Sequence, residues 1–154
     1  MMEPAADEPV ARLEQSVRFW RTIRSPGYPF DEDAVRARCA RMIDRAHHPE
    51  GTTRQLAAIV AHGSREPGLR KLDIPTLVIH GVDDPLVPVA CGERTAEVIP
   101  GADLMLVPGM GHDFPPELHG KLVESIAGMA ARVRRRGEER PREGREEPVQ
   151  PRLG

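Results

Sequence analysis

The sequence predicts an α/β protein with a parallel sheet, and three observations support this prediction. The first part of the 154-residue chain carries apolar side chains at helical spacing. The second part holds two short apolar runs, each followed by a stretch with helical periodicity. Continuous apolar runs between turn residues are typical of strands buried on both faces of a parallel sheet. The order strand–helix–strand–helix is that of a right-handed crossover unit.

Three helices are expected before the first strand. The first runs from Pro9 to Arg24, the second starts at the acidic residues 31–33, and the third runs from residues 51–53 to a point near Gly63. We expect the apolar stripes of these helices to pack in the protein interior. The stripe residues are Val10, Leu13, Val17, Trp20, Ile23, Val35, Cys39, Met42, Ile43, Leu56, Ile59 and Val60.

The second part of the chain predicts two strands, Ile74–Ile79 and Leu104–Val107, with a helix at Cys91–Val98 between them. A last helix is expected from Pro116 to about Val133. Two parallel strands alone cannot cover both faces or satisfy both edges of a sheet. We therefore expect the sheet to be incomplete.

The end of the chain is rich in charge, with eight arginines and five glutamates among residues 132–154. Such a segment cannot bury enough apolar surface to offset its ordering entropy, so we expect it to be disordered. Arg134–Arg136 could instead tether the chain to a nucleic acid or a membrane. The interleaved glutamates and the net charge of −2 favour no nucleic-acid partner.

Composition also indicates a compartment. Cys39 and Cys91 are isolated and predict no disulfide framework. No signal-like start and no apolar run near the roughly 18 residues of a membrane span is present. We expect a cytoplasmic protein without a membrane partner.

Two residues at the ends of the predicted strands form the candidate site. Asp84 follows the first strand and precedes Pro85, which favours an extended backbone at Asp84. His112 follows the second strand in a glycine-rich turn. In parallel sheets such strand ends share one edge, where a carboxylate can orient an imidazole that acts as a general base. Asp83 competes for the acid role, and the alternative is that Asp84 caps a turn while His112 is an ordinary loop residue.

The other histidines suggest no metal site and no cofactor. They show no metal-ligand spacing, and no phosphate-binding glycine loop is present. We expect them to be loop or helix-end residues: His47, His48, His62, His80 and His119.

Four segments of the chain have a familiar pattern: Leu69–Pro88, Ile99–Ala102, Pro108–His112 and Arg24–Asp31. Through them the chain, over roughly residues 15–131, resembles the C-terminal half of α/β-hydrolase-fold enzymes, in particular the esterase-type group that includes aclacinomycin methylesterase-like proteins. The resemblance implies that Asp84 is the triad acid and His112 the triad histidine. It also implies that the helices before about Ala61 form a lid.

The resemblance divides the chain into three parts. Residues 1–62 would be a helical cap or lid, residues 63–131 the C-terminal part of the hydrolase core, and residues 132–154 the disordered tail. The expected fold is thus a partial α/β-hydrolase fold, with lid helices followed by the last two parallel strands and their helices.

The family's nucleophile is missing from the sequence. Its serine lies within a Gly-x-Ser-x-Gly elbow before the acid, and none of Ser16, Ser25, Ser64 and Ser125 has that context. We therefore expect a truncated ester or acyl-bond hydrolase that is inactive alone. A small-molecule ester would be its substrate only when an N-terminal half completes it. The alternative is a non-catalytic interaction module, or half of a split enzyme completed by another chain, with self-association through the exposed sheet edge.

Overall fold

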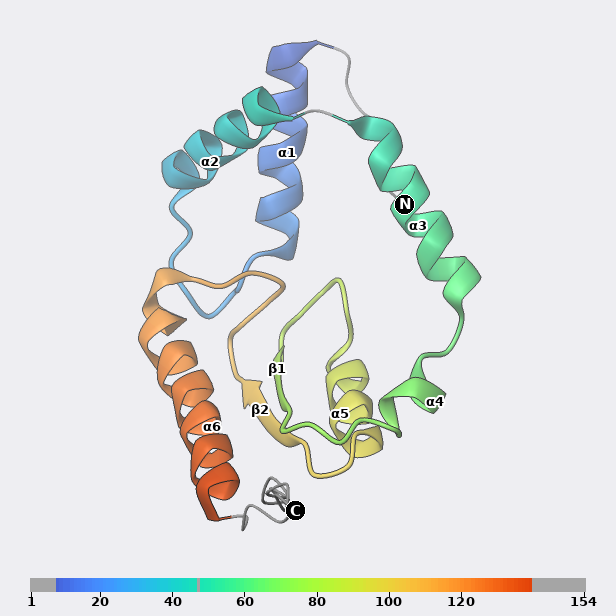
Figure 1. Cartoon of the computed structure of the whole chain (residues 1–154). Coiled ribbons are helices and arrows are strands. Elements are labelled where there is room, and N and C mark those ends of the chain that lie inside the picture. Colours follow the sequence, from blue (N-terminus) through green and yellow to red (C-terminus); the bar gives the residue numbers. More distant parts are fainter. Residues whose placement is uncertain (1–7, 47, 140–154) are drawn as a thin grey trace, which may run out of the picture.

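A computed structural model of the chain describes residues 8–46 and 48–139 (Figure 1). Helices occupy the first part of the described chain, and strands alternate with helices in the second part. The elements in order are α1 (Pro9–Ile23), α2 (Glu32–Arg45), α3 (Pro49–His62), α4 (Glu66–Leu69), β1 (Leu77–Gly81), α5 (Val89–Val98), β2 (Asp103–Val107), the 3-10 helix η1 (Pro116–Leu118) and α6 (His119–Glu139).

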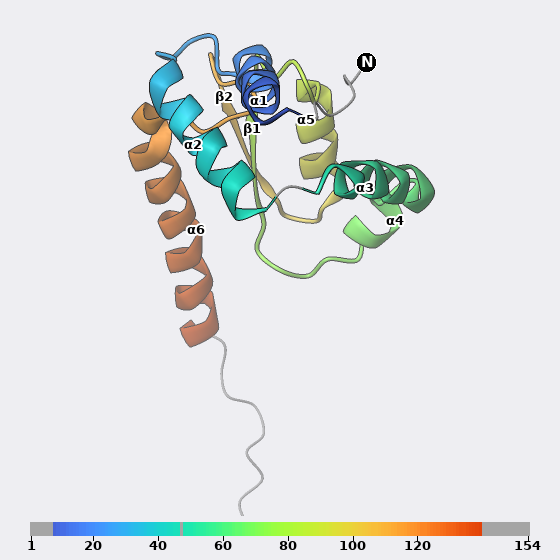
Figure 2. The same ribbon diagram turned by 90° about the horizontal axis from the view of Figure 1, so that it is seen from above.

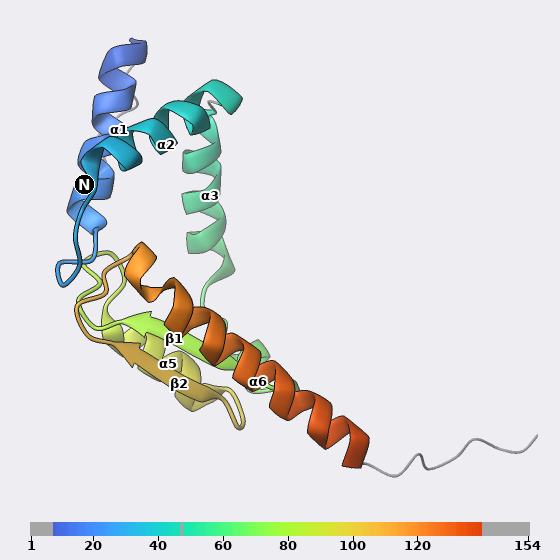
Figure 3. The same ribbon diagram turned by 90° about the vertical axis from the view of Figure 1, so that its left-hand side faces the viewer.

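The two strands form a parallel pair, in register from Leu77 beside Asp103 to Gly81 beside Val107. Helix α5 lies on one face of this pair and α6 on the other (Figure 3). The α/β class and the parallel pairing predicted from the sequence are confirmed. The described sheet has two strands, as a partial fold would have.

Strand β1 begins later than predicted, and it is less buried. Ile74 is 61% exposed, and β1 starts at Leu77 because Pro75 has no N–H to contribute to a ladder. The side chains from Leu77 to His80 are half-buried, so burial of this strand on both faces was a wrong expectation. Among the described residues β1 pairs with β2 alone, so its other edge and the adjoining side chains on both faces lack a neighbouring strand to cover them.

A small core forms between β2 and α6. Val107, Met110, Leu118 and Leu122 are buried together, and Tyr28, Ile79 and Met105 pack against them. Met110 belongs to the loop that follows β2, so this core supports the same loop that carries His112. The position of the histidine therefore depends on packing beneath the carboxyl end of the sheet.

Helices α1 and α2 pack against each other above that end of the strands (Figures 1 and 2). Val17 and Ile23 of α1 and Cys39 of α2 are buried. Asp31 caps α2 by accepting a hydrogen bond from Ala34 N at 2.9 Å, as its place before an acidic first turn suggests.

The apolar side chains of helix α3 are more exposed than predicted. Its apolar residues Leu56, Ile59 and Val60 are 46%, 53% and 81% exposed, although we expected them to pack in the interior. Val10 in α1 and Met42 in α2 are exposed as well. An apolar stripe is buried only when another element covers it, and the described elements offer these side chains no such surface.

Helix α6 extends to Glu139, beyond the predicted end near Val133. Residues 132–139 are therefore helical, whereas the sequence suggested disorder from residue 132. Arginine and glutamate have high helix propensity, so extending an existing helix through them costs little. The rest of the predicted tail, residues 140–154, lies outside the described residues. Within the described segments, no helix is both long and apolar enough to cross a lipid bilayer.

Candidate active site

The carboxyl ends of the two strands bring an acid and a histidine together. Asp84 follows β1, His112 follows β2, and the parallel pairing places both residues at one edge of the sheet. The His112 Nδ1 atom lies 2.7 Å from Asp84 Oδ2. The Asp84 side chain is 5% exposed and that of His112 is 41% exposed, so a buried carboxylate faces an accessible imidazole.

Asp84 is held by its own turn. Its Oδ1 atom accepts hydrogen bonds from Leu86 N at 2.8 Å and from Val87 N at 2.9 Å. Burial works against ionisation of Asp84, but the hydrogen bonds from Val87 N, His112 and Leu86 N outweigh it and lower the pKa of Asp84 below its ordinary value. One side chain thus both caps a turn, which was the alternative reading of Asp84, and pairs with the histidine.

This pairing assigns the tautomer of the histidine. An ionised carboxylate only accepts hydrogen bonds, so in the neutral ring Nδ1 carries the proton and this N–H donates a hydrogen bond to Asp84. The lone pair is then on Nε2, where it can accept a proton. A histidine in this state is suited to act as a general base.

Asp83, the competing candidate, has a different partner. Its Oδ2 atom accepts a hydrogen bond from Gly109 N at 2.7 Å, and its own N–H donates to Met110 O at 3.0 Å. Gly109 has a positive φ of 76°, a conformation that favours glycine. Asp83 therefore ties the loop after β2 to the loop after β1.

Sequence reasoning missed His80, which it placed among ordinary histidines. The His80 Nε2 atom lies 3.0 Å from Val87 O and 4.0 Å from Asp84 Oδ2. Its spacing of four residues from Asp84 was the available signal. His80 thus supports the Asp84 turn from the strand side.

Sequence reasoning also missed a contact between distant segments. Residues 23–25, at the end of α1 and directly after it, lie against residues 111–113, and Ser25 hydrogen-bonds to Asp113. No local pattern signals a pairing across 88 positions.

Comparison with known proteins shows the family of the chain. Residues 32–138 match the family of TAP-like proteins, an α/β-hydrolase family. The chain belongs to the TAP-like family. The match includes both Asp84 and His112.

Relatives of this TAP-like chain include esterases. It is 31% identical over 132 residues to rhodomycin D methylesterase DnrP from Streptomyces peucetius, with 82% of this chain and 42% of the relative covered. The structure of a bromoperoxidase from Bacillus anthracis is similar, with a TM-score of 0.63, 26% identity, and coverage of 78% of this chain and 44% of that one. An esterase from Rhodococcus sp. ECU1013 shares the fold, with a TM-score of 0.56, 23% identity, and coverage of 82% and 44%. The chain spans less than half the length of each.

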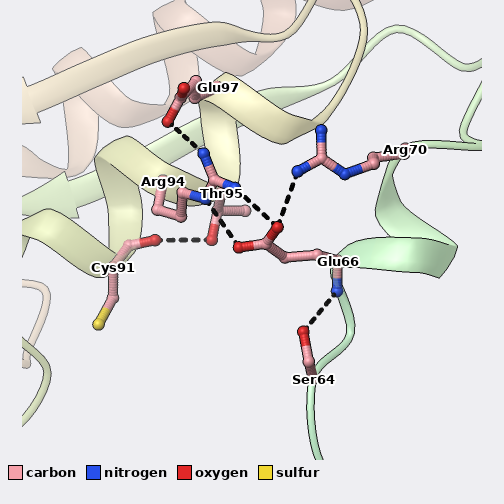
Figure 4. Close-up of polar contacts among 7 residues, drawn as sticks. All are labelled: Ser64, Glu66, Arg70, Cys91, Arg94, Thr95 and Glu97. Atoms are coloured by element: carbon pink, nitrogen blue, oxygen red, sulfur yellow. Dashed lines mark hydrogen bonds and ion pairs between the residues drawn. The ribbon is translucent and has the colours of Figure 1, made fainter.

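Ser64, one of the four serines of the sequence, lies in the segment between α3 and α4. Its Oγ atom accepts from Glu66 N at 3.4 Å, next to α4 (Figure 4). Glu66 in turn binds Arg94 of α5 through both carboxylate oxygens, each at 2.7 Å. Arg94 lies in the second half of α5, the helix that leads back toward the start of β2. The printed contact of the Ser64 hydroxyl is thus with the start of α4, whereas His112 Nδ1 contacts Asp84.

The remaining histidines do not gather into a site. His119 Nε2 lies 3.1 Å from Phe114 O, His62 ends α3, and His48 precedes it. In the described parts of the TAP-like chain, no three His, Cys, Asp or Glu side chains are arranged to hold a metal ion. His47 lies outside those parts.

Proposed function

We propose that Asp84 and His112 are the acid and the histidine of a Ser-His-Asp triad in an esterase-type hydrolase. The observation that carries the proposal is the 2.7 Å contact between His112 Nδ1 and the buried Asp84 carboxylate. Membership of an α/β-hydrolase family and the esterase relatives support the same chemistry.

In this proposal, His112 Nε2 removes the proton from a serine hydroxyl as that oxygen attacks an ester carbonyl. The imidazolium that forms is stabilised by the Asp84 carboxylate, whose lowered pKa keeps it ionised at neutral pH. His112 then gives the proton to the departing alcohol. Water hydrolyses the resulting acyl-enzyme by the same base catalysis.

We propose further that the nucleophile is supplied by a polypeptide segment outside these 154 residues, so that this chain alone is inactive. No Gly-x-Ser-x-Gly elbow occurs in the sequence. Residues 1–62 would serve as the cap and residues 63–131 as part of the core. A small ester would then bind between the completed core and the cap.

The test is hydrolysis of a p-nitrophenyl short-chain ester, with the purified chain and its His112→Ala variant measured side by side. We expect neither to exceed the buffer rate. Activity in the unsubstituted chain that disappears in His112→Ala would place a nucleophile within these residues, and Ser64 would be the first to substitute.

The second arm co-expresses the chain with the N-terminal part of rhodomycin D methylesterase DnrP that the chain does not cover. We expect hydrolysis from the co-purified pair, and we expect His112→Ala to abolish it. Hydrolysis that survives His112→Ala would contradict the assignment of His112 as the base.

A second candidate function is that of an interaction module. The observation that favours it is the open surface of the described sheet together with the exposed apolar side chains of α3, Leu56, Ile59 and Val60. In that case the chain associates with itself or with another polypeptide and catalyses nothing. Stable association without any hydrolysis in either arm would favour this candidate.

A further inference from the structure

A buried serine lies where the segment after α1 meets the loop that carries His112. Ser25 is a polar residue that is only 3% exposed. It follows the end of α1 at Ile23 by two residues. Neither the fold nor the proposed triad explains why a hydroxyl should be buried there.

The Ser25 side chain binds the residues on both sides of His112. Its hydroxyl donates to Asp113 Oδ1 and accepts from Gly111 N at 2.8 Å. The Ser25 N–H also donates to Asp113 Oδ1, at 2.8 Å. The His112 N–H itself donates to Ile23 O at 2.8 Å. Three consecutive residues of the histidine loop are thus bound to residues 23–25.

The backbone of residues 23–25 is in close contact with the backbone of the loop that carries His112. A Cβ atom on Gly111 would lie 2.4 Å from Arg24 O, too close for any side chain, so this glycine allows the approach. Gly27 N donates to Gly109 O at 2.9 Å, which extends the contact by one more pair. Figure 1 shows the two loops side by side at the carboxyl end of the sheet.

We propose that Ser25 and Asp113 are positioning residues that set the His112 ring against Asp84; this inference rests on the proposed function. Asp84 is already held by Leu86 N and Val87 N, so the Nδ1 contact depends on where the His112 backbone lies. The His112 side chain is 41% exposed, so packing around the ring does not hold it in place. The hydrogen bonds to Ser25 and Ile23 hold the backbone instead.

The test is nuclear magnetic resonance of the full chain labelled with 15N-histidine, which reads the tautomer of each ring without any need for activity. The sequence contains six histidines, and His112→Ala assigns the signal. In the unsubstituted chain at a pH where the ring is neutral, we expect His112 as the Nδ1–H tautomer, with a downfield proton from its bond to Asp84.

Ser25→Ala and Asp113→Ala are expected to abolish this downfield proton and the preference for Nδ1–H. Asp113→Asn keeps an oxygen that can accept from Ser25, so it should retain the signature. Ser16→Ala is the control serine, because Ser16 is partly buried and its hydroxyl donates to Arg12 O within α1 at 3.0 Å, with no bond to the loop of His112. It should leave His112 unchanged.

Circular dichroism shows which variants are folded. If Ser25→Ala does not fold, the comparison of Asp113→Ala with Asp113→Asn tests the inference. A folded Ser25→Ala or Asp113→Ala chain with an unchanged His112 signal would overturn the inference.

Asp84→Asn distinguishes the positioning role from the proposed acid–histidine pair. If it removes the signature while the Ser25 and Asp113 variants do not, the acid–histidine pair stands and the positioning role is wrong. Absence of the signature from the unsubstituted chain would contradict the pair itself, and the positioning role with it.

Discussion

The two adjacent aspartates after β1 have different roles because their side chains point toward different partners. Asp84 faces His112 and is buried, whereas Asp83 faces the backbone of Gly109. The same side chain therefore serves as a candidate acid at one position and as a loop anchor at the next. Both loops of the site are held by carboxylates that accept backbone N–H groups.

Asp84→Asn in the completed enzyme tests this division. We expect kcat to fall by about 10⁴-fold, because an amide cannot stabilise the imidazolium or select the catalytic tautomer. Asp83→Asn retains an oxygen for Gly109 N and should change kcat far less. The measurement is ester hydrolysis by the co-expressed pair, and equal losses in the two variants would contradict the assignment of Asp84.

A glycine in a close backbone contact and a glycine with free space around it should respond differently to substitution by alanine. A Cβ atom on Gly81 would lie 2.3 Å from Met110 O and 2.5 Å from Gly111 O, so Gly81→Ala forces the two loops of the site apart. We expect a loss of about 1–3 kcal/mol in the free energy of unfolding, as for other overpacked sites.

Gly128→Ala is the matched control, because nothing lies within 4 Å of a Cβ at that position of α6. Alanine there should stabilise the chain by about 0.5–1 kcal/mol through helix propensity. Urea unfolding followed by circular dichroism measures both variants. A Gly81→Ala chain as stable as the unsubstituted one would mean that the loops can move apart freely.

Among the secondary-structure elements, α4 and α5 are joined by charged side chains. Glu66 of α4 accepts from Arg94 of α5 and from Arg70 at 2.9 Å, and Arg94 also binds Glu97 at 2.7 Å (Figure 4). Hydrogen bonds from Arg94, opposed by desolvation and helped by Arg70, lower the pKa of Glu66 from 4.5 to about 2.

This network predicts how stability depends on pH. Because the pKa of Glu66 is lower in the folded chain, its contribution is present above pH 4.5 and is lost as the pH falls from 4.5 toward 2. The melting temperature of Glu66→Gln should therefore lie below that of the unsubstituted chain at pH 7, and the difference should shrink at pH 3. Thermal melts at the two pH values measure it. A constant difference would show that Glu66 stabilises the chain by some means other than its charge.

The helices before β1 differ in how much they depend on packing. Val17 of α1 is 1% exposed, whereas Ile59 of α3 is 53% exposed. We expect Val17→Ala to lower the free energy of unfolding by about 1–3 kcal/mol and Ile59→Ala by less than about 0.5 kcal/mol. Urea unfolding decides this. A large loss in Ile59→Ala would mean that α3 is covered in solution.

At the scale of the whole molecule, the described chain carries an α/β unit with one pair of strands and an apolar helix surface that no described element covers. Both features favour association, since sheet edges and exposed apolar patches are common contact sites. We expect sedimentation velocity to show a mass that rises with protein concentration. A single species at the monomer mass over the whole range would contradict self-association.

Local patterns in the chain were sufficient to predict the α/β class, the helices α1, α2, α3, α5 and α6, and the two strands. They also singled out Asp84 and His112, because turn residues after apolar runs mark the ends of strands. These predictions depend on short-range spacing, which sequence displays directly. Burial was less predictable: the stripe of α3 has the right periodicity but lies exposed.

Contacts between distant residues needed the folded chain. Nothing near Asp83 indicates that it binds Gly109, and nothing near Ser25 indicates that it binds Asp113, because both pairs form only once β1, β2 and α1 have come together. The residues of a loop determine which of its groups can donate or accept hydrogen bonds. The packing of the helices and strands around the loop determines which partners those groups find. The sequence alone was therefore sufficient to pick out the acid and the histidine at the strand ends. The hydrogen bonds that hold the histidine form only when distant segments pack together, so only the tertiary structure shows them.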